Sequence, residues 1–156
     1  MVEQLICNQQ AVGSSPTSGS WKLAWREDSH HLVVDSALEL KRALDEIDAS
    51  AGEHFPIAVL TARSGAELHI GLGHPTTSLL LWFPPDYEGS GSMHSVGDPA
   101  AAERDEWEPS LTFFVFGHHS EFPKSSGVPK ELARSVASSF LATGGQPSNE
   151  ITWEPD

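Results

Sequence analysis

The sequence predicts an α+β domain with a largely antiparallel sheet of about six strands and two packed helices. Strand-like and helix-like runs are mixed along the chain without regular strand–helix alternation, which disfavours a parallel sheet. Pairs of strand-like runs are joined by short turn-forming segments, as in antiparallel hairpins. Two longer segments repeat their apolar residues at helical spacing. We place the domain in residues 21–156.

The first predicted hairpin begins at Trp21. Trp21, Leu23 and Trp25 alternate with other residues in a period of two, as in a strand with one apolar face. A polar turn separates them from the strand-forming run 31–34. The short polar connection predicts that the two strands pair as a hairpin.

The first helix is predicted to run from Ala37 to about Ala49. Ser36 and Glu39 match a capping box, in which each side chain satisfies a free amide at the helix start. Gly52 is expected to end the helix. The predicted buried stripe consists of Ala37, Leu40, Leu44 and Ile47.

Three strands are predicted next. Runs 56–61 and 67–72 flank a turn centred on Ser64-Gly65, which is typical of a hairpin. Run 78–83 is continuously apolar, which predicts burial on both faces, and the prolines that follow should stop it. Gly71 and Gly73 lack the further glycine, lysine and helix start of a phosphate-binding loop, so we expect a bulge or turn there and no cofactor.

The C-terminal part is predicted as strand, loop, helix and strand. The aromatic run 111–116, closed by Gly117, should be a central and well buried strand, and 118–127 should be loop. A helix at 129–143 is expected to bury one side against the sheet, with Gly144 as its stop. The rings of Phe114 and Phe140 are expected in the core. A last short strand, 151–153, should follow.

Residues 1–20 stand apart from this pattern. They are rich in Ser, Gly, Gln and Pro and contain one charged residue, Glu3. One interpretation is a disordered tail. The other is a non-native extension from a misassigned start, since 13–17 can be encoded by bases that resemble the T-arm of a transfer RNA gene. Both interpretations predict that the segment carries no function.

Charge and composition limit the function classes. The formal net charge is -13, with 22 acidic against 9 basic residues, which disfavours nucleic acid and favours a basic protein partner. The single cysteine, Cys7, can form neither an internal disulfide nor a thiolate zinc site. No apolar run is long enough for a membrane span, and no signal peptide is recognisable. A cytoplasmic protein is therefore expected.

Several short motifs resemble the Imm1 family of immunity proteins in their order and spacing. They are His119–Pro123, Val128-Pro129, Phe140–Pro147 and Trp153-Glu154, preceded by 68–73 and 95–98. The resemblance covers roughly 21–154. It implies an immunity protein, not an enzyme, that neutralises a secreted bacterial toxin, often one with a deaminase fold. Together with the acidic charge, which would steer the protein onto a basic toxin cleft, the resemblance favours stoichiometric blockade of the toxin's active site as the mechanism.

The long acidic segment 84–109 is the main candidate for partner contact, because long loops on a rigid sheet commonly carry recognition. Trp107 lies among carboxylates, which suits an interface anchor, although a tryptophan folded back onto the core would look the same in sequence. The candidate contact residues in this segment are Asp86, Tyr87, Glu88, Asp105, Glu106, Trp107 and Glu108.

His118, His119 and Glu121 form a second candidate cluster. Two imidazoles and a carboxylate can hold a metal ion and activate water, which makes a small metal-dependent hydrolase the alternative function. The spacing disfavours it, because adjacent histidines usually point apart and no established ligand motif is present. In the immunity interpretation, the same three residues are candidates for toxin contact.

Overall fold

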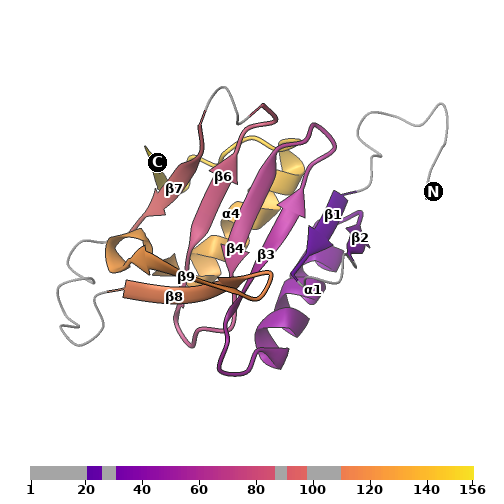
Figure 1. Cartoon of the computed structure of the whole chain (residues 1–156). Helices are drawn as coiled ribbons and strands as arrows, with labels where there is room; N and C mark the ends of the chain where they lie inside the picture. The colour runs from indigo at the N-terminus through magenta and orange to yellow at the C-terminus, as the bar shows by residue number, and fades with distance from the viewer. Residues whose placement is uncertain (1–20, 26–30, 87–90, 98–109) are drawn as a thin grey trace, which may run out of the picture.

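The computed structural model describes residues 21–25, 31–86, 91–97 and 110–156. Two helices, α1 (Ala37–Ser50) and α4 (Lys130–Ala142), lie side by side on one face of a nine-stranded sheet (Figure 1). The β8–β9 hairpin crosses part of the opposite face. The predicted α+β class with a largely antiparallel sheet and two helices is therefore confirmed, with more strands than expected.

Seven strands form the main path of the sheet, and all neighbours along it are antiparallel. In spatial order they are β11 (Thr152–Pro155), β7 (Met93–Val96), β6 (Leu80–Phe83), β4 (Glu67–Gly71), β3 (Pro56–Thr61), β1 (Trp21–Ala24) and β2 (Leu32–Val34). β8 (Ser110–Val115) joins β3 in parallel and pairs with β9 (His118–Pro123). A separate small sheet pairs β5 (Thr77–Ser78) with β10 (Val128–Pro129).

The start of α1 follows the sequence closely. The Glu39 N–H donates to Ser36 Oγ at 3.1 Å, and the Glu39 carboxylate accepts from the Asp35 N–H at 3.0 Å. The Glu39 side chain therefore bonds to the backbone N–H of Asp35, one residue before the N-cap Ser36, and not to the N–H of Ser36 itself. Ala43 replaces Ala37 in the buried stripe, because Ala37 lies in the exposed first turn.

The predicted hairpins β1–β2 and β3–β4 are present, with Gly65 at a φ of +97° in the second turn. The expectation for 78–83 is wrong in part. The long strand begins at Leu80, and Leu81, Trp82 and Phe83 are only half-buried. The physical reason is the layering, since both helices lie on the same face of the sheet and the other face of β6 has no helix over it.

Helix α4 supplies the centre of the core. Its buried residues are Ala133, Val136, Ala137 and Phe140, as the helical spacing predicts. The Phe140 ring meets the Trp21 ring edge-on, with 5.4 Å between centroids. Gly144 follows the helix at a φ of +79°, a conformation that favours glycine, so the predicted stop is confirmed.

Two predicted loops contain strands. β7 lies within 84–109, and β9 with the 3₁₀ turn η2 (Lys124–Ser126) replaces the loop expected at 118–127. β7 lacks a clear apolar alternation, but tertiary contacts hold it in the sheet. The fully buried Ser95 hydroxyl accepts from the Leu80 N–H at 3.1 Å and donates to the Ser126 carbonyl at 2.6 Å.

β8 is not the well buried central strand that its sequence predicts. Its bridges to β3 are at Pro56 and Ile57, and its buried side chains are Leu111 and Phe113, which pack on the sheet face away from the helices. Phe114 is half-buried on the other side of β8. Only every second side chain of β8, at Leu111 and Phe113, therefore packs against the sheet.

Candidate partner-binding surface

The sheet face opposite the helices carries a lateral row of side chains from neighbouring strands. Register pairs Val59 with His69, His69 with Leu81, Leu81 with His94, and His94 with Glu154. Directly paired residues project to the same side of a sheet. The row thus crosses β3, β4, β6, β7 and β11 on the face that the helices leave uncovered.

His69 is the centre of this face. Its Nε2 lies 2.9 Å from Glu67 Oε1, and its ring stacks at an angle on Phe83 with 4.5 Å between centroids. The His69 side chain is 14% exposed and the Glu67 side chain 35%. The centre of this face is therefore a half-buried surface that contains both aromatic and polar side chains and is not a purely apolar patch.

A second histidine marks the β7–β11 end of the row. His94 Nδ1 lies 2.7 Å from Asp156 Oδ1, and its Nε2 lies 3.7 Å from Glu154 Oε1. Ser92 Oγ also donates to the Asp156 carboxylate. The Glu154 and Asp156 side chains are 66% and 44% exposed, so this end of the sheet presents carboxylates to solvent.

The predicted cluster of His118, His119 and Glu121 lies on β9. Strand alternation puts His119 and Glu121 on one side, with His119 Nε2 3.9 Å from Glu121 Oε2, and turns His118 to the other side. Within the described residues, no group of three or more His, Cys, Asp or Glu side chains is placed to hold a metal ion. His119 instead contacts the Phe114 ring, with 5.6 Å between centroids.

The other predicted contact residues fall mostly outside the described part of the chain. Asp86 is exposed three residues after β6 ends. Tyr87, Glu88 and the run Asp105–Glu108, with Trp107, lie outside the described residues. The structure therefore brings His119 and Glu121 together and places His118 on the other side of β9, and the predicted partner contacts of all these residues stay predictions.

Sequence reasoning missed His69, Leu81 and His94. A signal was present for His69, because Glu67 and His69 alternate with the buried Leu68 and Ile70, and this period of two marks the face away from the core. No comparable alternation exists in β6 or β7. Their contribution to the face follows from strand pairing.

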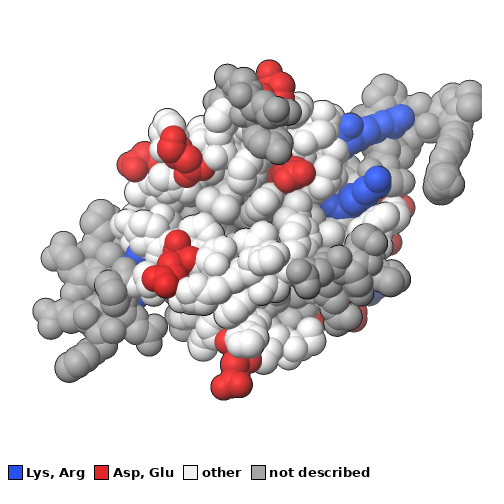
Figure 2. Space-filling view, viewed as in Figure 1, with Lys and Arg blue, Asp and Glu red and all other residues white. Residues whose placement is uncertain are grey.

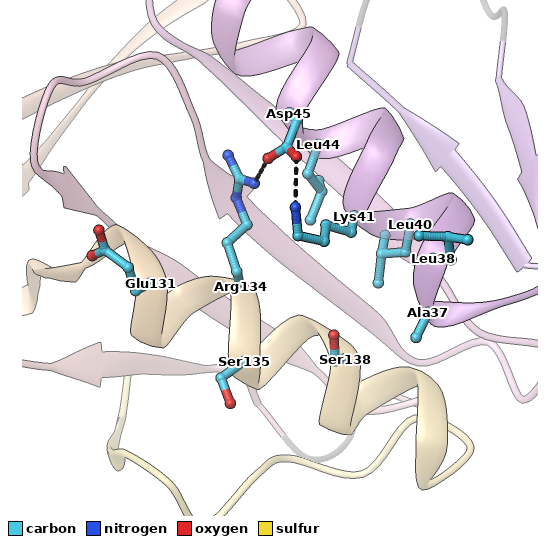
Figure 3. A pocket seen from close by; sticks show the side chains of 10 residues that line it. All are labelled: Ala37, Leu38, Leu40, Lys41, Leu44, Asp45, Glu131, Arg134, Ser135 and Ser138. Atoms are coloured by element: carbon cyan, nitrogen blue, oxygen red, sulfur yellow. Dashed lines mark hydrogen bonds and ion pairs between the residues drawn. The ribbon is translucent and has the colours of Figure 1, made fainter.

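On the opposite side of the molecule, α1 and α4 enclose a groove of about 660 Å³. Figure 3 shows Leu38 and Leu40 of α1 near one end, and Arg134 of α4 reaching toward Asp45 at the other. Asp45 accepts hydrogen bonds from both Arg134 and Lys41. The groove thus joins an apolar end to a charged end whose ions are already paired.

Two carboxylates of α1, Asp45 and Asp48, are paired with cations of the fold. Arg134 and then Lys41, each hydrogen-bonded to Asp45, lower the pKa of its carboxyl group. Burial raises the pKa of Asp48, but hydrogen bonds from Lys130, at 2.8 Å, and from the Gly73 N–H outweigh it and lower the pKa. These ion pairs connect the two helices.

Figure 2 shows the sheet face that the helices do not cover. Carboxylates are distributed around a largely uncharged central area, and lysine and arginine side chains gather mainly on the β1 side of this view. A neutral centre with a charged rim is the usual anatomy of a protein–protein interface.

No helix in the described part of the chain is long and apolar enough to cross a membrane. Comparison with curated proteins gives no match. A protein-family model described as "Immunity protein Imm1" matches residues 28–155, which is most of the chain. This range includes the β4–β6–β7 face and the C-terminal motifs that suggested the same family. The chain therefore belongs to the Imm1 family of immunity proteins.

Proposed function

We propose that this protein binds a cognate bacterial toxin and neutralises it by stoichiometric blockade of the toxin's active site. The observation that carries the proposal is membership of the Imm1 family, which points to immunity against a toxin. The role is that of a binding protein rather than an enzyme, exerted in the cytoplasm of the producing cell. It requires no cofactor, membrane or nucleic acid.

The charge supports a partner with a basic surface. Toxins that act on nucleic acid, including those with a deaminase fold, need positive charge to hold phosphates. A protein of net charge -13 is steered toward such a surface and competes with the substrate for it. A deaminase-type or other nucleic-acid-targeting toxin is therefore the class that we propose.

We further propose that the acidic segment 86–108 contributes to the contact, with Tyr87 and Trp107 as anchors. The exposed carboxylate of Asp86 begins this segment, and His118, His119 and Glu121 on β9 are further contact candidates. Aromatic anchors surrounded by polar residues are typical of binding hot spots.

The proposal is tested with the cognate toxin domain, which we expect to be encoded beside this gene. Co-expression should protect cells from the toxin, and the purified pair should form a complex. Titration of toxin activity should reach complete inhibition at one immunity protein per toxin. Loss of toxin activity at a small fraction of that ratio would indicate catalysis and contradict blockade, and absence of a complex would contradict the function itself.

A further inference from the structure

We propose that the toxin docks on the part of the sheet that neither the helices nor the β8–β9 hairpin covers, which we call the open face. It comprises Glu67, His69, Leu81, Phe83 and His94, with Glu154 and Asp156 at its rim. This inference rests on the proposed function, because it assigns a surface to the toxin. It commits to a toxin surface that carries an apolar side chain at its centre and arginine or lysine around it.

The exposed fraction of the side chains on the open face increases from its centre to its rim, as in a protein–protein interface. The central His69 side chain is 14% exposed, whereas Glu154 at the rim is 66% exposed. Leu81 and Phe83 are half-buried beside the centre. An apolar and aromatic centre loses its remaining water when a partner covers it, and the rim stays polar.

Charge compensation distinguishes the open face from the charged end of the groove between the helices. The helix-layer carboxylates Asp45 and Asp48 are paired with arginine and lysine. Within the described residues, the ion pairs of Glu67, Glu154 and Asp156 are all with histidines. A lysine or arginine cancels a carboxylate's charge at neutral pH, whereas a histidine does so only when it is protonated. Net negative charge therefore remains available on the open face.

The groove between the helices is the competing docking surface. Leu38 in this groove is 57% exposed, so it offers an apolar contact. Its charged end, however, already contains the Arg134–Asp45–Lys41 cluster. A basic partner would meet the protein's own cations there, which is why the open face suits it better.

The location is tested with variants of the two faces and the same cognate toxin domain, carrying an inactivating substitution. His69→Ala at the centre should weaken binding at least about tenfold, as expected for truncation of an interface hot spot. The matched helix-face variant Leu38→Ala should stay within about twofold of wild type, since it lies outside the contact.

Rim charge is tested separately. Glu154→Gln with Asp156→Asn should slow association severalfold at low salt and leave dissociation nearly unchanged. The control is Glu46→Gln with Glu53→Gln, which removes two exposed carboxylates of the helix layer and its flank. A slower association in the control pair alone would overturn the inference.

Hydroxyl-radical footprinting of the wild-type complex gives an answer that does not depend on variant folding. Leu81, Phe83 and His94 should be protected by the toxin, and Leu38 should not. Protection of Leu38 alone would place the toxin on the helices and overturn the inference while leaving the proposed function intact. A wild-type protein that does not bind the toxin would overturn both.

Discussion

Single residues determine how closely the layers of this fold approach each other. The Phe113 ring lies directly over Gly71, where an added Cβ would come within 2.6 Å of Phe113 Cε1. At Gly97, an added Cβ would come within 1.7 Å of the Gly127 carbonyl oxygen. Glycine is required at both positions because of close approach, at residues where sequence alone suggested a turn or a family motif.

Gly97→Ala is expected to destabilise the protein by more than the 1–3 kcal/mol typical of an overpacked core, on the order of 3 kcal/mol or above. The contact is with backbone rather than with a movable side chain, so β7 and η2 must separate and lose the 2.6 Å bond from the Gly97 N–H to the Ser125 carbonyl. Chemical denaturation measures the change. Gly91→Ala is not a suitable control because its φ is +75°, whereas Gly52→Ala meets no atom within 4 Å and should cost little.

Neighbouring phenylalanines on β8 should differ strongly in their contribution to stability. Phe113→Ala and Phe140→Ala should each cost about 3–5 kcal/mol, because both rings are fully buried. Phe114→Ala should cost clearly less, since that ring is half-buried between the rings of His54 and His119. Equal losses for Phe113 and Phe114 in urea denaturation would contradict this assignment of the two faces of β8.

At the scale of elements, the connection between α4 and β11 is held by side-chain bonds from three directions. Trp82 Nε1 donates to the Gly145 carbonyl at 3.0 Å, and Trp153 Nε1 donates to the Ser148 carbonyl at 2.7 Å. The Glu150 carboxylate accepts from Ser135 and Ser139 of α4 and from Ser148. This part of the Imm1-like motif therefore has a structural role, which is to place β11 at the edge of the sheet.

Glu150→Gln should lower stability at neutral pH, and the difference from wild type should shrink on acidification. Hydrogen bonds from Ser135, Ser139 and Ser148 lower the pKa of Glu150 from its usual 4.5. A carboxyl group with a lowered folded-state pKa stabilises the fold above its unfolded pKa, and this contribution is lost as pH falls through the folded-state pKa. Melting temperatures of both proteins from pH 7 down to pH 3 test this, and a constant difference across the range would contradict it.

At the scale of the whole molecule, excess negative charge should act mainly on the rate of association. Replacing Asp105, Glu106 and Glu108 by Ser should slow toxin binding and reduce its salt dependence, because charge acts on association mainly through long-range steering. Trp107→Ala should instead raise the dissociation rate, at a cost on the order of 2 kcal/mol if the indole is an anchor. Binding kinetics at several salt concentrations separate the two effects, and unchanged rates in both variants would exclude this segment from the contact.

Local signals in the sequence determined the elements whose stability is local. The Ser36–Glu39 cap, the helical spacing from Ala133 to Phe140 and the turn at Gly65 each involve residues close together in the chain. For the same reason the α+β class could be predicted, since it depends on the order of such elements.

Only the tertiary structure decided how the predicted hairpins join one another in the sheet and which side chains from different strands share a face. β7 contains few apolar residues and becomes a strand because it pairs with β6 and with β11, which lies far along the chain. β9 becomes a strand because it folds back on β8 after the tight turn at Phe116 and Gly117. Likewise the open face brings His69, Leu81 and His94 together from three strands. Pairing between strands distant in sequence satisfies backbone groups through long-range contacts, so no local pattern can specify it.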